Sequence, residues 1–358
     1  MADSVAEQIA ALQDEDWAVR EDAAALLGAA RDARAIVPLI TTLRDSDKAV
    51  RDAASRALIA IGAAAVTPLL DWLRDPGSEE PVAGILVVIG DSRAIDALIG
   101  ALSSSNWIVR MHAAKGLGKI GDLRAVDPLI PLLQDKVKAV REEAAAAMSA
   151  IGTAAIPELL RALKHPEWLV RLHAVEALGR MRSPDATDSL LHVLFNDADA
   201  SVREDAAHAL GEIGDPRAVE FLLVAMQTVG IRPRAIAALG MIRDQRAIPA
   251  LTAVVKGTSK PAQDRPLQGC GDRYDEEMFA MEAAVRALAE IGDPGVIPTL
   301  VEALQNTVVR AEAAAALAVF GQASVPSLLE VLRKERDTNI VYHVRETLAQ
   351  VGWRGGRV

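Results

Sequence analysis

Three histidines fall at equivalent positions of a repeated motif, two residues after the residue that marks each copy. These are His112, His173 and His343, and carboxylates fill the position in other copies at Asp22, Glu143, Asp205 and Glu312. Histidine and carboxylate side chains bind metal ions such as iron, so a shared metal site is the first chemistry to test. Helices stacked at about 10 Å per layer would hold His112 and His173, two copies apart, about 20 Å from each other. That distance is too long for one ion, so we expect a solvated helix face, no metal site and no cofactor.

The copies are marked by a Val-Arg pair. Its arginines are Arg20, Arg51, Arg110, Arg141, Arg171 and Arg203, and weaker copies centre near Glu79, Arg232, Met281, Arg310 and Val341. The step from 20 to 51 and the step from 110 to 141 are both 31 residues. A period of this length is typical of a solenoid, and the chain holds about eleven such units.

Each unit carries two apolar patterns of helical period. The first is represented by "VREEAAAAMSAIG" (140–152) and the second by "AVDPLIPLL" (125–133). Glycine just after the first pattern predicts a helix end, and the aspartate that follows, such as Asp122, suits the cap of the next helix. Proline near the start of the second pattern is tolerated because the first helical turn has free N–H groups. Each unit is therefore predicted to be a helical hairpin that buries its apolar faces against its neighbours.

Two stretches resemble a known family. "VREDAAHALGEIGDPRAVEFLL" and the copy that begins "VREDAA" near the N-terminus are similar to the short HEAT-like repeats of the phycobilisome-lyase (PBS lyase, E/F) type, over nearly all of residues 5–352. The resemblance implies an all-α, right-handed α-solenoid of about eleven hairpins of about 30 residues. It also implies three kinds of function: a scaffold, a phycobilin lyase or its chaperone subunit, and an iron-dependent oxidoreductase like deoxyhypusine hydroxylase. The hydroxylase is disfavoured because its metal-binding His-Glu pairs are replaced here by Met111-His112, Leu172-His173 and Tyr342-His343.

Composition narrows the choice of partner. The net charge of -10 and the pI near 5.2 argue against nucleic acid, because phosphate contacts need surplus Lys and Arg. A single cysteine fits a reducing, cytoplasmic setting. No run of 18 apolar residues is present, so we expect no membrane partner.

The repeat pattern also breaks at residues 74–90, but its clearest failure lies between Arg232 and Met281, where the step is 49 residues. This divides the chain into HEAT-like repeats with a half-repeat cap (1–255), a loop insertion (256–276), further repeats with a C-terminal half-repeat cap (277–352) and a flexible tail (353–358). Long loops in compact arrays are either binding elements or tolerated insertions. Cys270, Arg273 and Tyr274 are the candidate partner-binding residues of this loop.

The remaining expectations concern surfaces. Trp17, Trp107 and Trp168 precede the marker arginines and are expected to pack on the neighbouring hairpin. Aspartates lie just before the arginines, as Asp14 does before Arg20, so Arg–Asp hydrogen bonds should tie the turns together. The second helix of each hairpin is expected to line the concave groove.

Three exposed side chains of the second helices are the further candidate partner-binding residues. They are Asp71, Arg161 and His192. Their types differ from unit to unit, which suits a protein surface better than DNA. The sequence therefore predicts a non-catalytic scaffold whose partner is a protein, with a phycobiliprotein or another cofactor-bearing protein as the candidate that the resemblance implies.

Overall fold

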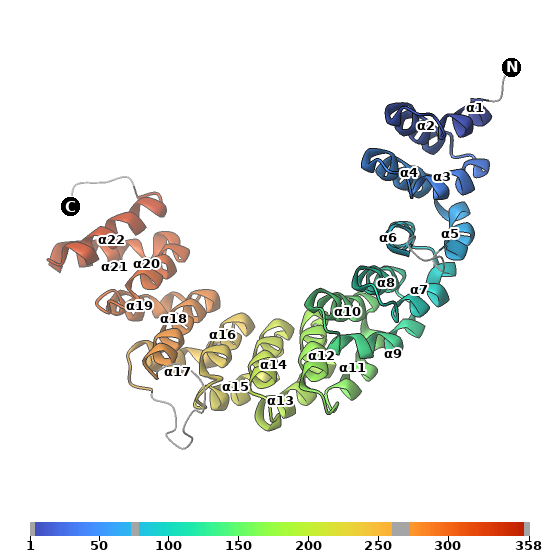
Figure 1. The fold of residues 1–358 in the computed structure, drawn as a ribbon. Coiled ribbons are helices and arrows are strands. Elements are labelled where there is room, and N and C mark those ends of the chain that lie inside the picture. The colour runs from blue at the N-terminus through green and yellow to red at the C-terminus, as the bar shows by residue number, and fades with distance from the viewer. Residues whose placement is uncertain (1–3, 73–78, 260–272, 354–358) are drawn as a thin grey trace. The chain divides into compact units, whose positions relative to one another are not determined.

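The computed structural model describes residues 4–72, 79–259 and 273–353, and these are helical hairpins throughout (Figure 1). No strand occurs in this part of the chain. The molecule divides into two compact units, Met1–Ala177 and Leu178–Val358. Each unit is an all-α solenoid, so the predicted fold class is confirmed, while the handedness of the superhelix stays a prediction.

The first unit begins with α1 (Ser4–Ala11), which has no first helix of its own and packs on α2. The first helices of its hairpins are α2 (Trp17–Ala30), α4 (Lys48–Ile61), α6 (Glu79–Ile89), α8 (Trp107–Ile120), α10 (Lys138–Ile151) and α12 (Trp168–Met181). The second helices are α3 (Ile36–Thr42), α5 (Val66–Trp72), α7 (Ile95–Ala101), α9 (Val126–Leu129) and α11 (Ile156–Ala162). The second unit alternates in the same way, with second helices α13 (Thr187–Asn196), α15 (Val219–Ala225), α17 (Ile248–Val255), α19 (Ile297–Ala303) and α21 (Val325–Lys334). Its first helices are α14 (Ala200–Ile213), α16 (Arg232–Ile242), α18 (Arg273–Ile291), α20 (Arg310–Val319) and α22 (Thr338–Gln350).

The turn within each hairpin follows the sequence closely. Helix α8 ends at Ile120 and is followed by Gly121, whose φ of 74° lies in the left-handed region. Asp122 then accepts a hydrogen bond from the backbone N–H of Arg124 at 2.9 Å and so caps a short 3-10 turn, Leu123–Ala125, that leads into α9. The glycine stop and the aspartate cap were both predicted, and they are confirmed here.

First helices approach each other more closely than second helices do. A Cβ placed on Gly118 of α8 would lie 2.6 Å from Cα of Ala147 on α10, so only glycine permits this approach. Second helices of successive hairpins touch in few places. The layer of first helices is therefore the tighter one, and each unit bends toward it.

Figure 1 shows this bend within the first unit, where α2, α4, α8 and α10 lie on the inner side and α3, α7, α9 and α11 on the outer side. The prediction that the second helix lines the concave groove was therefore wrong. Its physical reason is the run of small residues in the first helix, which brings that layer together.

The predicted insertion (256–276) falls between α17 and α18, and its bounds stay a prediction. Helix α17 ends at Val255, and α18 begins at Arg273, so Arg273 and Tyr274 lie in the first turn of a helix instead of a loop. Cys270 lies outside the described residues. The fully buried Arg232 donates to the carbonyl oxygens of Met226 and Ser259, both at 2.8 Å, and so holds the start of the insertion against the previous turn.

One stretch, Lys48–Trp72, is long and apolar enough to cross a membrane by length and composition alone. It is not a single rod, because it comprises α4, a 3-10 turn at Gly62–Ala65 and α5. Its side chains Val50, Leu58 and Leu69 are buried within the array. The stretch is therefore a packed hairpin of the solenoid.

Candidate functional site

The exposed side of the first helices forms the inner face of the first unit. A first helix packs against its own second helix and against the first helices on both sides, so the side left exposed points inward. Residues four apart share one side of a helix. On α8 this stripe is Trp107, Met111 and Lys115; on α10 it is Lys138, Glu142 and Ala146; on α12 it is Trp168, Leu172 and Glu176, and each of these is exposed or half-buried.

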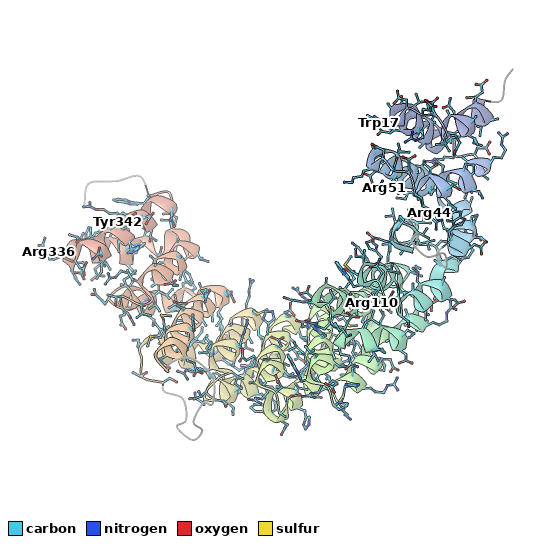
Figure 2. The ribbon with its side chains drawn as sticks, viewed as in Figure 1. Trp17, Arg44, Arg51, Arg110, Arg336 and Tyr342 are labelled. Atoms are coloured by element: carbon cyan, nitrogen blue, oxygen red, sulfur yellow. The ribbon has the colours of Figure 1, made fainter. Side chains whose placement is uncertain are left out.

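The tryptophans are the largest exposed groups of this face. Trp17 is 49% exposed, and Trp107 and Trp168 are each 41% exposed, while their packing on the neighbouring hairpin stays a prediction. Each is the first residue of its helix. Trp17 and Trp107 directly follow a capping residue; for Trp107 this is Asn106, whose side chain accepts from the N–H of Ile108 at 2.9 Å. The ring therefore stands at the edge of the packed layer. Figure 2 shows Trp17 on the inner side of the unit.

A clasp of hydrogen bonds joins successive hairpins, and Arg110, which Figure 2 labels, donates them in one of these clasps. Arg110 donates from Nε and Nη2 to the two carboxylate oxygens of Asp135, at 2.8 and 2.9 Å, and from Nη1 to the carbonyl of Ser104 at 2.8 Å. Arg20 makes the same clasp to Asp45, at 2.7 and 2.9 Å. Bidentate pairs of this kind fix geometry as well as contributing energy.

The clasps also act on the carboxyl groups. The hydrogen bonds from Arg20 hold the pKa of Asp45 below its usual value. Burial opposes this at Asp135, yet Arg110 still leaves the pKa of that carboxyl lowered. Both aspartates therefore stay charged at neutral pH, and the spacing of the hairpins is held by ion pairs.

The histidines do not assemble into a metal site. Nδ1 of His173 lies 2.8 Å from Oε2 of Glu176, and its Nε2 lies 3.3 Å from Nε of Arg141. The arginine must donate, so Nδ1–H donates to the glutamate and both ring nitrogens are occupied. His112 lies against Gly84 of α6, and its Nδ1 has no partner among the described residues. No group of three or more potential ligands that could hold a metal occurs in the described ranges.

The sequence-based candidates lie elsewhere. Asp71 on α5 and Arg161 on α11 are exposed, but they belong to the second helices and so to the outer layer of the first unit. Arg161 pairs with Glu158 and, at 3.4 Å, with Asp127. His192 on α13 belongs to the second unit and lies 3.2 Å from Nδ2 of Asn196. Their role as partner contacts stays a prediction, as does that of Cys270, Arg273 and Tyr274.

The inner-face residues Met111, Leu172 and Ala146 were missed from the sequence. A signal was present: the residue after the marker arginine is apolar in the copies of Met111 and Leu172, whereas it is acidic at Glu21 and Glu142. This contrast can be interpreted only once the structure shows that the residue after the marker arginine lies on the exposed inner face.

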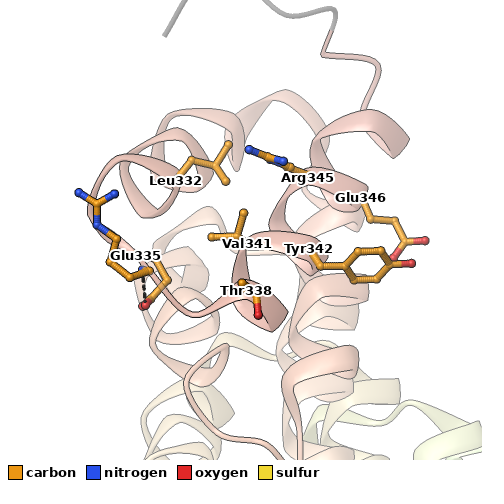
Figure 3. Close-up of a pocket in the computed structure, with 8 residues that line it drawn as sticks. Leu332, Glu335, Thr338, Val341, Tyr342, Arg345 and Glu346 are labelled. Atoms are coloured by element: carbon orange, nitrogen blue, oxygen red, sulfur yellow. Dashed lines mark hydrogen bonds between the residues drawn. The ribbon is translucent and has the colours of Figure 1, made fainter.

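A hollow lies at the C-terminal end of the second unit, between α21 and α22 (Figure 3). Its volume is about 840 Å³, and Leu332, Val341, Tyr342 and Arg345 are among its lining residues. Tyr342 is 61% exposed. The lining mixes apolar side chains with both signs of charge.

Comparison with known proteins places these features in context. The family model for HEAT repeats matches residues 5–84, 82–149, 137–206, 156–229, 190–263 and 280–349. Phycocyanobilin lyase subunit alpha of Nostoc sp. is 30% identical over 212 residues, which cover 56% of this chain and 75% of that protein. The corresponding subunit of Picosynechococcus sp. is 27% identical over 192 residues, covering 51% and 69%. Deoxyhypusine hydroxylase of Aspergillus oryzae is 27% identical over 216 residues, covering 51% and 63%.

Solved structures share the fold at low identity. Kap121p superposes with a TM-score of 0.63 at 14% identity, over 98% of this chain and 46% of that one. Kap95p, in a complex with RanGDP, gives a TM-score of 0.56 at 16% identity, over 97% and 51%. The chain thus spans about half the length of these neighbours, and the likeness concerns the solenoid fold alone.

Proposed function

The chain belongs to the HEAT repeat family, and from this premise we propose that it is a non-catalytic scaffold that binds a partner protein on the inner face of its first unit. The observation that carries the proposal is the pair of tryptophans, Trp107 and Trp168, each 41% exposed at equivalent positions of that face. Exposed tryptophans are costly in water, and they are among the residues that contribute most to protein interfaces.

The architecture supports binding by a preformed surface. The clasp between Arg110 and Asp135 fixes the step between the hairpins of α8 and α10. Close contact between Gly118 and Ala147 fixes the same step at the centre of the layer. A surface held in this way loses little conformational entropy on binding, so more of the contact energy appears as affinity.

The test is a quantitative pull-down from native cell extract with the wild-type chain and the double variant Trp107→Ala, Trp168→Ala. We expect the proteins that wild type enriches to fall at least tenfold with the double variant, since buried interface tryptophans commonly contribute more than 2 kcal/mol each. Val37→Ala, which removes a 56% exposed apolar side chain from α3 in the outer layer, is the matched control and should change nothing. Equal capture by wild type and the double variant would refute the proposal.

A second candidate is a phycobilin lyase, or a subunit that assists one. It is favoured by the match to phycocyanobilin lyase subunit alpha of Nostoc sp. over 75% of that protein. The test mixes the purified chain with phycocyanobilin and an apo-phycobiliprotein and follows covalent attachment by absorbance and by bilin fluorescence in denaturing gels. A bilin that stays unattached and spectrally unchanged removes this candidate.

We do not propose the hydroxylase activity for this chain, although the Aspergillus oryzae protein is similar over part of its length. At His173 both ring nitrogens are already engaged by Arg141 and Glu176. Measuring the iron content of the protein after anaerobic reconstitution tests this, and we expect no bound iron. The single cysteine supports a reducing compartment such as the cytoplasm as the site of action.

A further inference from the structure

The hollow between α21 and α22 lies on a side of the second unit where the repeat pattern changes. Helix α22 is the last described helix, and it packs on α20 and α21. Val341 takes the place that Arg110 has in its own hairpin, and the exposed Arg345 takes the place of a fully buried residue, Ala114. Val341 and Leu332 are half-buried and give the hollow an apolar floor. Covering apolar surface is favourable, so this side of the unit suits a contact.

The charged side chains of the hollow balance each other. Its lining holds two arginines, Arg336 and Arg345, and two glutamates, Glu335 and Glu346. Glu335 accepts from the backbone N–H of Asp337 at 2.9 Å and of Arg336 at 2.7 Å, and these hydrogen bonds lower its pKa, so it stays charged. The side chains of both arginines and of Glu346 form no ion pair within the described ranges. A surface with equal numbers of both charges favours neither a strongly acidic nor a strongly basic partner.

The unpaired charges lie on opposite sides of an apolar centre (Figure 3). Arg345 points toward Leu332, whereas Tyr342 and Glu346 extend in the opposite direction, and Val341 lies between the two groups. Tyr342 projects furthest into solvent, since 61% of it is exposed. One side therefore offers an apolar wall with an arginine, and the other side offers an aromatic ring with a carboxylate.

A two-fold axis that passes beside Val341 in the plane of contact would bring these unlike sides together. Half a turn places Tyr342 of one copy beside Leu332 and Arg345 of the other. It also places Glu346 of one copy opposite Arg345 of the other. Arginine binds carboxylates through two hydrogen bonds and stacks on aromatic faces, so one residue type serves both contacts. Each contact then occurs twice, as in any interface in which two copies use the same patch.

We propose that this hollow is the contact surface of a homodimer, in which two copies of the chain meet at α21 and α22 about a two-fold axis. Tyr342 is the aromatic anchor, a residue type enriched at the centres of interfaces. Arg345 and Glu346 form the ion pairs between the copies. The inference goes beyond the scaffold function, because a dimer carries two inner faces for partner proteins and so binds with higher avidity. It involves neither Trp107 nor Trp168, so the two proposals are tested separately.

Sedimentation equilibrium of the full chain measures the mass and the dissociation constant Kd of the dimer. We expect a mass of twice 38.0 kDa that falls toward 38.0 kDa on dilution. Tyr342→Ala should raise Kd at least tenfold, because it removes the anchor. Arg345→Glu and Glu346→Arg should each raise Kd further, because each sets like charges opposite one another twice. Lys115→Glu, the same change of charge at an exposed lysine of α8, is the matched control and should leave Kd unchanged.

Mixing the two charge variants tests the pairing itself. In the mixed pair, one chain carries glutamates at positions 345 and 346, and the other carries arginines at both. Opposite charges then face each other at both contacts, so we expect the mixture to regain the dimer that neither variant forms alone. Circular dichroism of each variant confirms that it is folded.

Four results would overturn the inference. They are a wild-type chain that stays at 38.0 kDa at every concentration, a dimer that all three hollow variants leave intact, a mixture of charge variants that forms no dimer, and a mass above two chains. The last result counts against it because an interface with two-fold symmetry closes at the dimer. Loss of native partners from the double tryptophan variant would leave the scaffold proposal standing in every case.

Discussion

Replacing Gly118 by alanine tests how closely neighbouring first helices approach. The added Cβ would lie 2.6 Å from Cα of Ala147, 2.9 Å from its Cβ and 3.3 Å from its carbonyl oxygen. These atoms belong to the backbone of α10 or are fixed to it, so no side-chain rotation can make room. The same contact recurs between Gly28 and Ala57, and the geometry therefore belongs to the array and not to one hairpin.

Two opposing effects set the magnitude. Alanine stabilises a helix interior by up to about 1 kcal/mol relative to glycine. Overpacking a well-filled contact costs about 1–3 kcal/mol, and a clash with backbone atoms falls in the upper part of that range. We therefore expect Gly118→Ala to lower the free energy of unfolding by about 1–2 kcal/mol.

Gly100→Ala is the matched control within the same unit. Gly100 lies on α7, is exposed, and a Cβ placed there would meet no atom within 4 Å. With the clash absent, only the helix preference remains, so this variant should be more stable than wild type by about 0.5–1 kcal/mol.

The assay is urea unfolding followed by circular dichroism, together with amide hydrogen exchange in α8 and α10. Hydrogen exchange is needed because repeat arrays can open locally, one pair of hairpins at a time. Faster exchange is expected in those two helices for Gly118→Ala only. Equal stabilisation by Gly118→Ala and Gly100→Ala would show that the first helices are further apart than described and would refute the account of the bend.

Other features give further predictions. Asp135→Asn removes the negative charge that pairs with Arg110. It should lower the free energy of unfolding in urea by about 1–2 kcal/mol, because a hydrogen bond between two charged groups is replaced by one to a neutral amide. An unchanged unfolding midpoint would contradict a stabilising role of the clasp. The Arg93 hydrogen bonds lower the pKa of Asp91 to about 2, below the value near 4 of an unfolded chain, so its contribution to stability is complete above about pH 4 and is lost as the pH falls to about 2. As the pH falls over that range, the melting temperature should decrease less steeply for Asp91→Asn than for wild type. Equal slopes of melting temperature against pH would argue against the Asp91–Arg93 pair. Arg232→Ala leaves two carbonyl oxygens without their donor and empties a fully buried site, so it should cost about 2–4 kcal/mol, measured by thermal unfolding.

Much of the local structure was predictable from short-range chemistry. The period of about 30 residues, the helix stop at Gly121 and the cap at Asp122 depend on residues close together in the chain, and all three are confirmed. The Arg–Asp bonds were predicted only in part. Arg20 does bind upstream, but to the carbonyl oxygen of Asp14 at 2.8 Å, while its carboxylate partner is Asp45 of the next hairpin.

The inner face was not predictable in the same way. The sequence alone determined that this protein is a row of paired helices, because a glycine, an aspartate and an apolar period act within a few residues of each other. Only the tertiary structure decided which layer faces inward, and with it whether Trp107 or Asp71 belongs to the concave side. Curvature depends on the distance between helices of different hairpins, and that distance is set by contacts such as Gly118 against Ala147, between residues about one repeat apart.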